Sequence, residues 1–121
     1  MFAHQIVDFT GPAAVQWTQA EEPADGGVVI DVVAAGVSFA DLLQTTGAYQ
    51  LKVPLPFTPG LDAAGLVRFA RPDLGLAAGQ RVAVLLSFGC WQEVISTPAE
   101  RVLAMPDGLS LEAGAALPST T

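Results

Sequence analysis

Val32–Gly65, VVAAGVSFADLLQTTGAYQLKVPLPFTPGLDAAG, is the stretch that decides the fold of this chain. It contains, in order, the end of an apolar strand, a short helix, a proline-rich crossing and the glycine-rich entry to another strand. Ser38 and Asp41 fit the capping-box pattern, in which the hydroxyl and the carboxylate accept backbone amides at the start of a helix. Gly47 is suited to end that helix in the left-handed conformation. We therefore expect one short helix over 38–47, between two strands.

The rest of the chain is typical of short strands separated by turns. Val28–Val37 is an almost continuous apolar run interrupted by Asp31, which favours a strand buried on both faces for much of its length. Glycine and proline turns about ten residues apart favour a small all-β barrel or sandwich with two short helices. The second helix is expected over Leu111–Leu117, capped by Ser110 and ended or kinked by Pro118. The other expected strands are Ala3–Phe9, Val15–Trp17, Ala63–Phe69, Arg81–Leu86, Trp91–Ser96 and Val102–Met105.

Composition excludes several function classes. The 121 residues suit one domain, and 51% hydrophobic with only 14% charged residues suggests that a partner domain or subunit covers part of the surface. A net charge of -7 without a basic cluster argues against nucleic-acid and anionic-membrane partners. No apolar run approaches the roughly 18 residues of a membrane helix, and no secretion signal is recognisable. The single cysteine, Cys90, fits a reducing cytoplasm.

Few residues form a recognisable catalytic pattern. His4 and Cys90 are far apart in the sequence, and no paired cysteine or histidine motif supports a zinc site. No Gly-x-Gly-x-x-Gly motif is present to hold a pyrophosphate. Asp41 and Asp62 could form a catalytic pair, but we interpret Asp41 as a helix cap and Asp62 as a loop anchor that accepts backbone amides. Tyr49 is either a half-buried loop aromatic or a hydroxyl that points into a cleft.

Several segments match, in order, the pattern of a known family. They are Gly36–Asp41, Gly47–Tyr49, Leu55–Val67, Gly79–Val84, Leu103–Ser110 and Ala115–Pro118. Together they resemble the medium-chain dehydrogenase/reductase superfamily, and most closely its zinc-free quinone oxidoreductase branch. The resemblance implies that residues 1–121 form the N-terminal portion of a GroES-like β-barrel, the catalytic domain. Residues from about 110 to 121 would then lead towards a Rossmann domain that this sequence lacks, and later strands would return to complete the barrel domain.

The resemblance also assigns site residues. Zinc-dependent relatives have a cysteine at the position of Ser38 and a histidine at that of Leu61, so the resemblance implies that no metal is bound. The quinone oxidoreductase branch usually has asparagine where Ser38 stands, and the free amides of this helix start would suit polar cofactor groups. Tyr49 would border the substrate cleft, and Thr120 would lie at the domain junction. The residues that would contact the cofactor are Ser38, Phe39, Asp41, Leu43 and Thr120.

The implied function is hydride transfer from NADPH to a quinone or an electron-poor enone, without zinc. The resemblance implies a cytoplasmic, homo-oligomeric parent enzyme, in which the Rossmann domain binds most of the NADPH. Two alternatives remain open at this point. One is a zinc-free reductase of the same superfamily that acts on enoyl thioesters or alkenals. The other is a non-enzymatic GroES-like binding module, which is disfavoured because the Tyr49 region resembles reductases.

Overall fold

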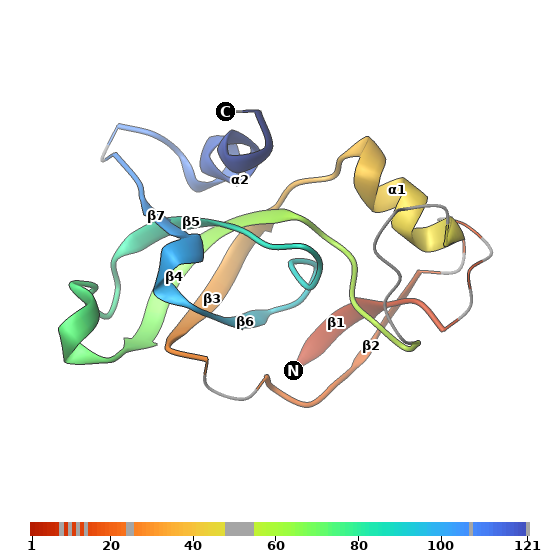
Figure 1. Ribbon diagram of the computed structural model, residues 1–121, viewed down its shortest axis with the longest axis horizontal. Coiled ribbons are helices and arrows are strands. Elements are labelled where there is room, and N and C mark those ends of the chain that lie inside the picture. Colours follow the sequence, from red (N-terminus) through yellow and green to blue (C-terminus); the bar gives the residue numbers. More distant parts are fainter. Residues whose placement is uncertain are drawn as a thin grey trace.

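The computed structural model describes residues 1–7, 9, 11, 13, 15–23, 26–47, 55–106 and 108–120, and for residues 116–120 it describes the backbone. Tyr49 therefore lies outside the described residues. The elements in chain order are β1 (Phe2–Gln5), β2 (Gln16–Gln19), β3 (Val28–Ala35), α1 (Phe39–Thr46), β4 (Asp62–Ala70), η2 (Pro72–Leu74), β5 (Arg81–Leu85), β6 (Val94–Thr97), η3 (Ala99–Arg101), β7 (Val102–Ala104) and α2 (Leu111–Thr120). Figure 1 shows their arrangement.

Two antiparallel sheets form most of the molecule. One is the pair β1–β2, and the other has the strand order β6-β3-β4-β5-β7. The long strands β3 and β4 are the central pair, and their register places Val32 opposite Gly65. The short sheet is attached to the rest of the chain through isolated bridges from Ala3 to Gln92 and from Ile6 to Phe57. Helix α1 extends from the end of β3, close to the β1–β2 end of the molecule (Figure 1).

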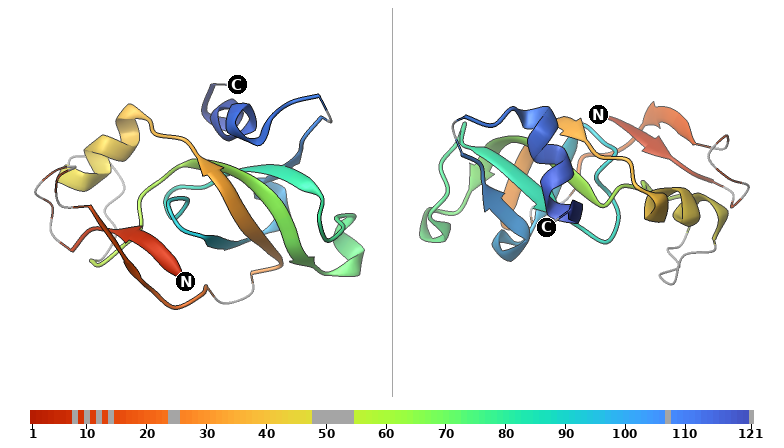
Figure 2. Two further views of the ribbon diagram at one scale, coloured as in Figure 1. Left: turned by 180° about the vertical axis from the view of Figure 1, so that it is seen from behind. Right: turned by 90° about the horizontal axis from the view of Figure 1, so that it is seen from above.

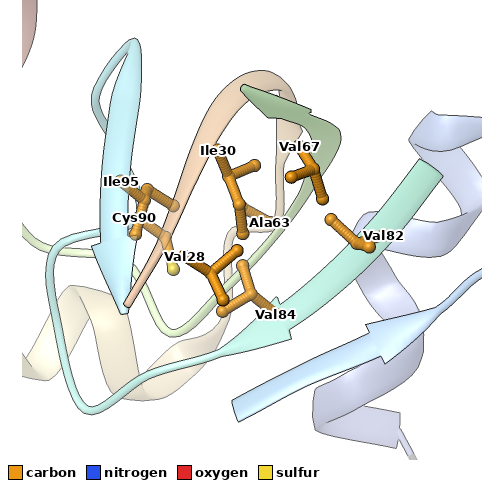
Figure 3. Packing of buried hydrophobic residues seen from close by; sticks show 8 residues of the cluster. All are labelled: Val28, Ile30, Ala63, Val67, Val82, Val84, Cys90 and Ile95. Carbon is orange, nitrogen blue, oxygen red and sulfur yellow. The ribbon is translucent and has the colours of Figure 1, made fainter. Parts of the chain in front are cut away.

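The core consists of two apolar clusters. In the first, side chains from β3, β4, β5 and β6 point toward one another, as Figure 3 shows. Its members are Val28, Ile30, Ala63, Val67, Val82, Val84, Cys90 and Ile95. The second cluster joins Ala64, Ala83 and Met105 to Ala115 of α2, so α2 packs on β4 and β5 (Figure 2). The close fit leaves no space at Gly114, where an added Cβ would lie 2.4 Å from Met105 Cε.

The predicted fold class is confirmed: the chain is mainly β, with short helices. One prediction about a strand was wrong. Val28 and Ile30 are buried, but Val33 is 52% exposed, so β3 is not covered on both faces. The apolar run indicated a preference for extended backbone and could not show whether a second layer covers the strand. Pro118 does not end the second helix, because α2 continues to Thr120. None of the described helices is long and apolar enough to cross a membrane.

Candidate cofactor-facing site at helix α1

Helix α1 is fixed at both ends by local hydrogen bonds, as the sequence predicted. The Ser38 amide donates to Asp41 Oδ2 over 2.7 Å, and the Asp41 amide donates to Ser38 Oγ over 3.4 Å. These two bonds form the capping box. At the other end Gly47 adopts φ 74° and its amide donates to Gln44 O. The helix therefore has a defined start and a defined end.

The capping box changes what the helix start can offer to a ligand. We expected free amides at Ser38, but the amides of Ser38 and Asp41 are both bonded within the cap. The Ser38 hydroxyl oxygen takes part in the same box. A polar ligand group at Ser38 would have to share these groups with the cap. The amides of Ser38 and Asp41 are therefore not the free donors for polar cofactor groups that we expected from the sequence.

One side of α1 is apolar and open. Phe39 is 74% exposed and Leu42 38% exposed, and their spacing of three places them on the same side of the helix. Leu43 is half-buried beside them, and Val37, just before the helix, is 72% exposed. We call Val37, Phe39, Leu42 and Leu43 the α1 wall. It is the part of the predicted site that a flat apolar ligand could reach.

The buried side of α1 carries polar groups. Asp41, Gln44 and Thr45 are almost completely inaccessible. Asp41 was predicted to contact the cofactor, but its buried side chain bonds with Ser38 and has no accessible surface for that contact. Gln44 Nε2 donates to Ser87 O over 2.7 Å, which ties α1 to the segment after β5. The side chain of Asp41 can therefore act on the α1 wall only by holding the helix in place.

Asp62 differs from its predicted role. It is the first residue of β4 and is 1% exposed, whereas we expected an anchor within a loop. Its Oδ1 atom, like Asp41 Oδ1 and Gln44 Oε1, has no hydrogen-bond partner among the described residues. Burial raises the pKa of Asp41, hydrogen bonds from Ser38 partly offset this, and the negative charge of Asp62 raises it further. The two carboxyl groups therefore share one buried environment, which the sequence did not reveal.

A pocket of about 450 Å³ lies between the short sheet and the outer half of β3. Its lining includes His4, Trp17, Val33, Val37, Trp91 and Glu93. The His4 ring lies 4.6 Å from that of Trp17, and Trp91 Nε1 donates to Gly36 O over 2.9 Å. This bond links the pocket to the turn before α1. The pocket was not predicted from the sequence, although His4 and Trp17 are cross-strand partners that a β1–β2 register would have identified.

The other predicted site residues are distributed as follows. The backbone of Thr120 lies near the end of α2, and its side chain is outside the described part of the chain. The structure does bring α2 toward the start of α1, since a Cβ on Gly36 would lie 3.2 Å from Ala115 O. Cys90 is buried in the first core cluster, which confirms it as a packing residue. Burial, with the charges of Asp62 and Asp41, raises the pKa of its thiol, so it is a poor nucleophile.

No group of three or more histidine, cysteine, aspartate or glutamate side chains is placed to hold a metal ion within the described ranges. Ser38 and Leu61, the two positions at which the resemblance places zinc ligands in zinc-dependent relatives, have side chains of low metal affinity. Ser38 offers a hydroxyl that already takes part in the cap, and Leu61 offers only an aliphatic group. Neither provides the sulfur, imidazole or carboxylate ligands that zinc selects.

Comparison with known proteins gives consistent matches. A family model described as the alcohol dehydrogenase GroES-like domain matches residues 24–107. The mouse synaptic vesicle membrane protein VAT-1 homolog is 40% identical over 96 residues, which cover 78% of this chain and 24% of that protein. The chain thus spans about a quarter of that relative's length.

Solved structures agree with this match. A probable oxidoreductase from Mycobacterium abscessus is 39% identical with a TM-score of 0.87, covering 91% of this chain and 36% of that one. The quinone oxidoreductase from Thermus thermophilus, described together with its NADPH complex, is 34% identical with a TM-score of 0.82. That match covers 98% of this chain and 37% of the Thermus chain. The shared region therefore includes both α1 and α2.

Proposed function

This chain belongs to the alcohol dehydrogenase GroES-like domain family, and we propose that it forms the nicotinamide-facing part of a longer NADPH-dependent quinone reductase. The observation that carries the proposal is the α1 wall, an open apolar surface on a helix that is capped at both ends. The similarity to the Thermus quinone oxidoreductase, whose structure was solved with NADPH, supports the same assignment. In this proposal residues 1–121 are part of the catalytic domain, and residues from about 110 lead to a Rossmann domain.

The α1 wall fits the nicotinamide end of such a cofactor. Phe39 offers an exposed aromatic ring and Leu42 a half-exposed aliphatic group, which suit a flat heteroaromatic ring. No glycine-rich phosphate cradle occurs in the sequence, so the pyrophosphate would be held by the Rossmann domain. When bound, NADPH supplies the hydride that reduces an electron-poor carbonyl or enone. The α1 wall would orient the ring and exclude water from it.

The remaining site residues keep the roles proposed from the resemblance. Tyr49 would border the quinone cleft, and Ser38, Leu43 and Thr120 would contact the cofactor. We also propose that the reaction needs no zinc, because Ser38 and Leu61 provide no ligand that zinc prefers. A cytoplasmic location and a homo-oligomeric parent belong to the same proposal, and the single buried Cys90 is compatible with a reducing compartment.

The proposal is tested by kinetics of the longer protein that contains this chain. Oxidation of NADPH is followed with a series of small quinones, for the wild type, Phe39→Ala and the control Phe69→Ala. Phe69 is 49% exposed on β4, so the control removes an exposed phenyl ring outside α1. We expect Phe39→Ala to lower kcat/KM about tenfold, about 1.4 kcal/mol of transition-state stabilisation, and the control to change it little.

Three outcomes would contradict parts of this proposal. Absence of quinone reduction with NADPH would refute the activity, and reduction of alkenals or enoyl thioesters in its place would identify the alternative reductase. Loss of activity in EDTA, restored by zinc, would refute zinc independence. Equal kinetics of Phe39→Ala and Phe69→Ala would refute the role of the α1 wall.

A further inference from the structure

Asp41 on α1 and Asp62 on β4 are two carboxyl groups enclosed in the interior of the protein. Their exposed fractions are 0% and 1%. Asp62 Oδ1 lies directly against the turn before α1, because a Cβ added to Gly36 would be 2.2 Å from it. Asp41 lies on the buried side of the helix that follows this turn. Both side chains therefore lie at the junction of β3, α1 and β4, where burial and the charge of Asp62 raise the pKa of Asp41.

Both carboxyl groups lack part of their hydrogen bonding. Asp41 Oδ2 accepts the Ser38 amide, but the Oδ1 atoms of Asp41 and Asp62 have no partner among the described residues. An ionised carboxylate only accepts hydrogen bonds, whereas a protonated carboxyl group can donate one. Two buried carboxylates at one place also repel each other strongly, and a shared site usually retains a proton. The unpartnered oxygens and the burial thus both favour a state in which one of the two carboxyl groups is protonated.

Within the described part of the chain, the titratable groups on the surrounding elements do not offer a counter-charge. One of these groups is the buried thiol of Cys90, whose pKa is raised by its burial and further by the charges of Asp62 and Asp41. Arg68 on β4 pairs with Asp31 and Glu22 on the exposed side of the sheet. Arg81 on β5 donates to carbonyls before α2, and Glu112 on α2 is exposed. His4 and Glu93 line the pocket beside the short sheet.

We propose that Asp41 and Asp62 form a buried acid pair that keeps one proton at neutral pH and thereby positions α1 on the start of β4. Neither residue touches a ligand in this proposal; both are positioning residues. Loss of the proton would place two negative charges at the junction and loosen α1. The consequence for cofactor binding rests on the proposed function, because α1 carries the α1 wall, but the proton itself can be detected without any activity.

The direct test uses the full 121-residue chain with ¹³C-labelled aspartate. Side-chain carboxyl signals are followed by NMR from acidic to alkaline pH in the wild type, Asp62→Asn and the control Asp73→Asn. The Asp73 side chain is exposed, so its loss removes one carboxyl group at the surface. We expect one carboxyl group of the wild type and of the control to stay protonated at neutral pH. In Asp62→Asn the titration of Asp41 should move to lower pH, because burial and the negative charge of Asp62 together raise the pKa of Asp41 in the wild type.

Stability gives a second readout with a defined sign. A carboxyl group whose pKa is raised in the folded state favours folding at acidic pH, and this contribution is lost as pH rises toward the folded pKa. The urea midpoint of the wild type should therefore fall more steeply with rising pH than that of Asp62→Asn. In the longer protein, the KM for NADPH should rise at alkaline pH in the wild type and less so in the variant.

Failure of the acid pair and failure of the proposed function give different results. Two ionised carboxyl groups at neutral pH in the wild type would overturn the acid pair, whatever the enzyme does. A protonated pair in a protein that does not use NADPH would support the pair and refute the proposed function alone. If Asp62→Asn does not fold, Asp41→Asn keeps an oxygen for the cap, and its urea midpoint should depend less on pH than that of the wild type. A urea midpoint of Asp41→Asn that falls with pH as steeply as that of the wild type would also overturn the proposal.

Discussion

At Gly65, on β4, the backbone of β3 leaves no room for a side chain. A Cβ added there would lie 2.0 Å from Asp31 O and 3.0 Å from Val32 Cα. Both atoms belong to backbone that is fixed by the central strand pairing, so neither can move aside without breaking that register. Glycine is therefore required here for space, since its backbone angles are not unusual.

We predict that Gly65→Ala lowers the free energy of unfolding by about 1–3 kcal/mol, the usual cost of overpacking a well-filled site. Urea denaturation of the chain measures this. Gly108→Ala is the matched control, because a Cβ on Gly108 meets nothing within 4 Å. If the two variants unfold at the same urea concentration, the close approach of β3 and β4 is not as tight as described.

For single residues, contacts between neighbours in the sequence could be predicted, and contacts between residues far apart in the sequence could not. The capping box of Ser38 and Asp41 could be predicted because its partners are three residues apart. The proximity of Asp41 to Asp62 could not, because it depends on how the turn at Gly36 brings the start of α1 to the first residue of β4. For the same reason Asp62 was mistaken for a loop anchor: its burial comes from the turn at Gly36, far away in the sequence.

Among the elements, α2 depends on a contact that secondary-structure patterns do not show. The Arg81 guanidinium, on β5, donates to Pro106 O and Leu109 O, in the segment that leads into α2. The Met105 amide donates a hydrogen bond to Arg81 O. Arg81 therefore holds the connection between β7 and α2 against the sheet, and with it the packing of Ala115 on Ala64 and Ala83.

We predict that Arg81→Met lowers the free energy of unfolding by about 1–3 kcal/mol, because it removes the charge-assisted bonds to Pro106 O and Leu109 O. Hydrogen exchange of the α2 amides should accelerate more than that of β3. Arg71→Met is the control, because the Arg71 side chain is 61% exposed and makes a 3.7 Å contact with Asp73. Equal exchange in both variants would show that Arg81 does not hold α2.

The ends of the strands could be predicted where turns mark them. Whether another part of the molecule covers a face of a strand could not be predicted. Glycine and proline located the strands to within a few residues, since these residues fix the turns. The apolar composition of Val28–Val37 could not show that its outer half lines a pocket, because that depends on the placement of the short sheet. α2 also continues through Pro118 to Thr120, although proline disfavours the interior of a helix.

For the whole molecule, surface charge and exposed apolar groups have opposite effects on the association of copies of the chain. The chain has a net charge of -7 and a calculated isoelectric point near 4.2. Its described surface includes strongly exposed apolar side chains, among them Val37 and Phe39 of the α1 wall and Trp17 beside the pocket. Charge repulsion keeps copies apart at neutral pH, while contiguous apolar surface favours association.

We therefore predict that the chain self-associates more as the pH is lowered from about 8 towards about 5, and more at the higher pH when salt screens its charges. At about 0.15 M ionic strength the screening length is about 8 Å, so repulsion between copies is already reduced. Sedimentation velocity measures the association. Phe39→Ser should reduce it at the lower pH, and Phe69→Ser, an equal change on β4, should reduce it less. Association that is independent of pH and salt would contradict the role of charge. Equal effects of the two variants would show that the α1 wall is not the contact surface.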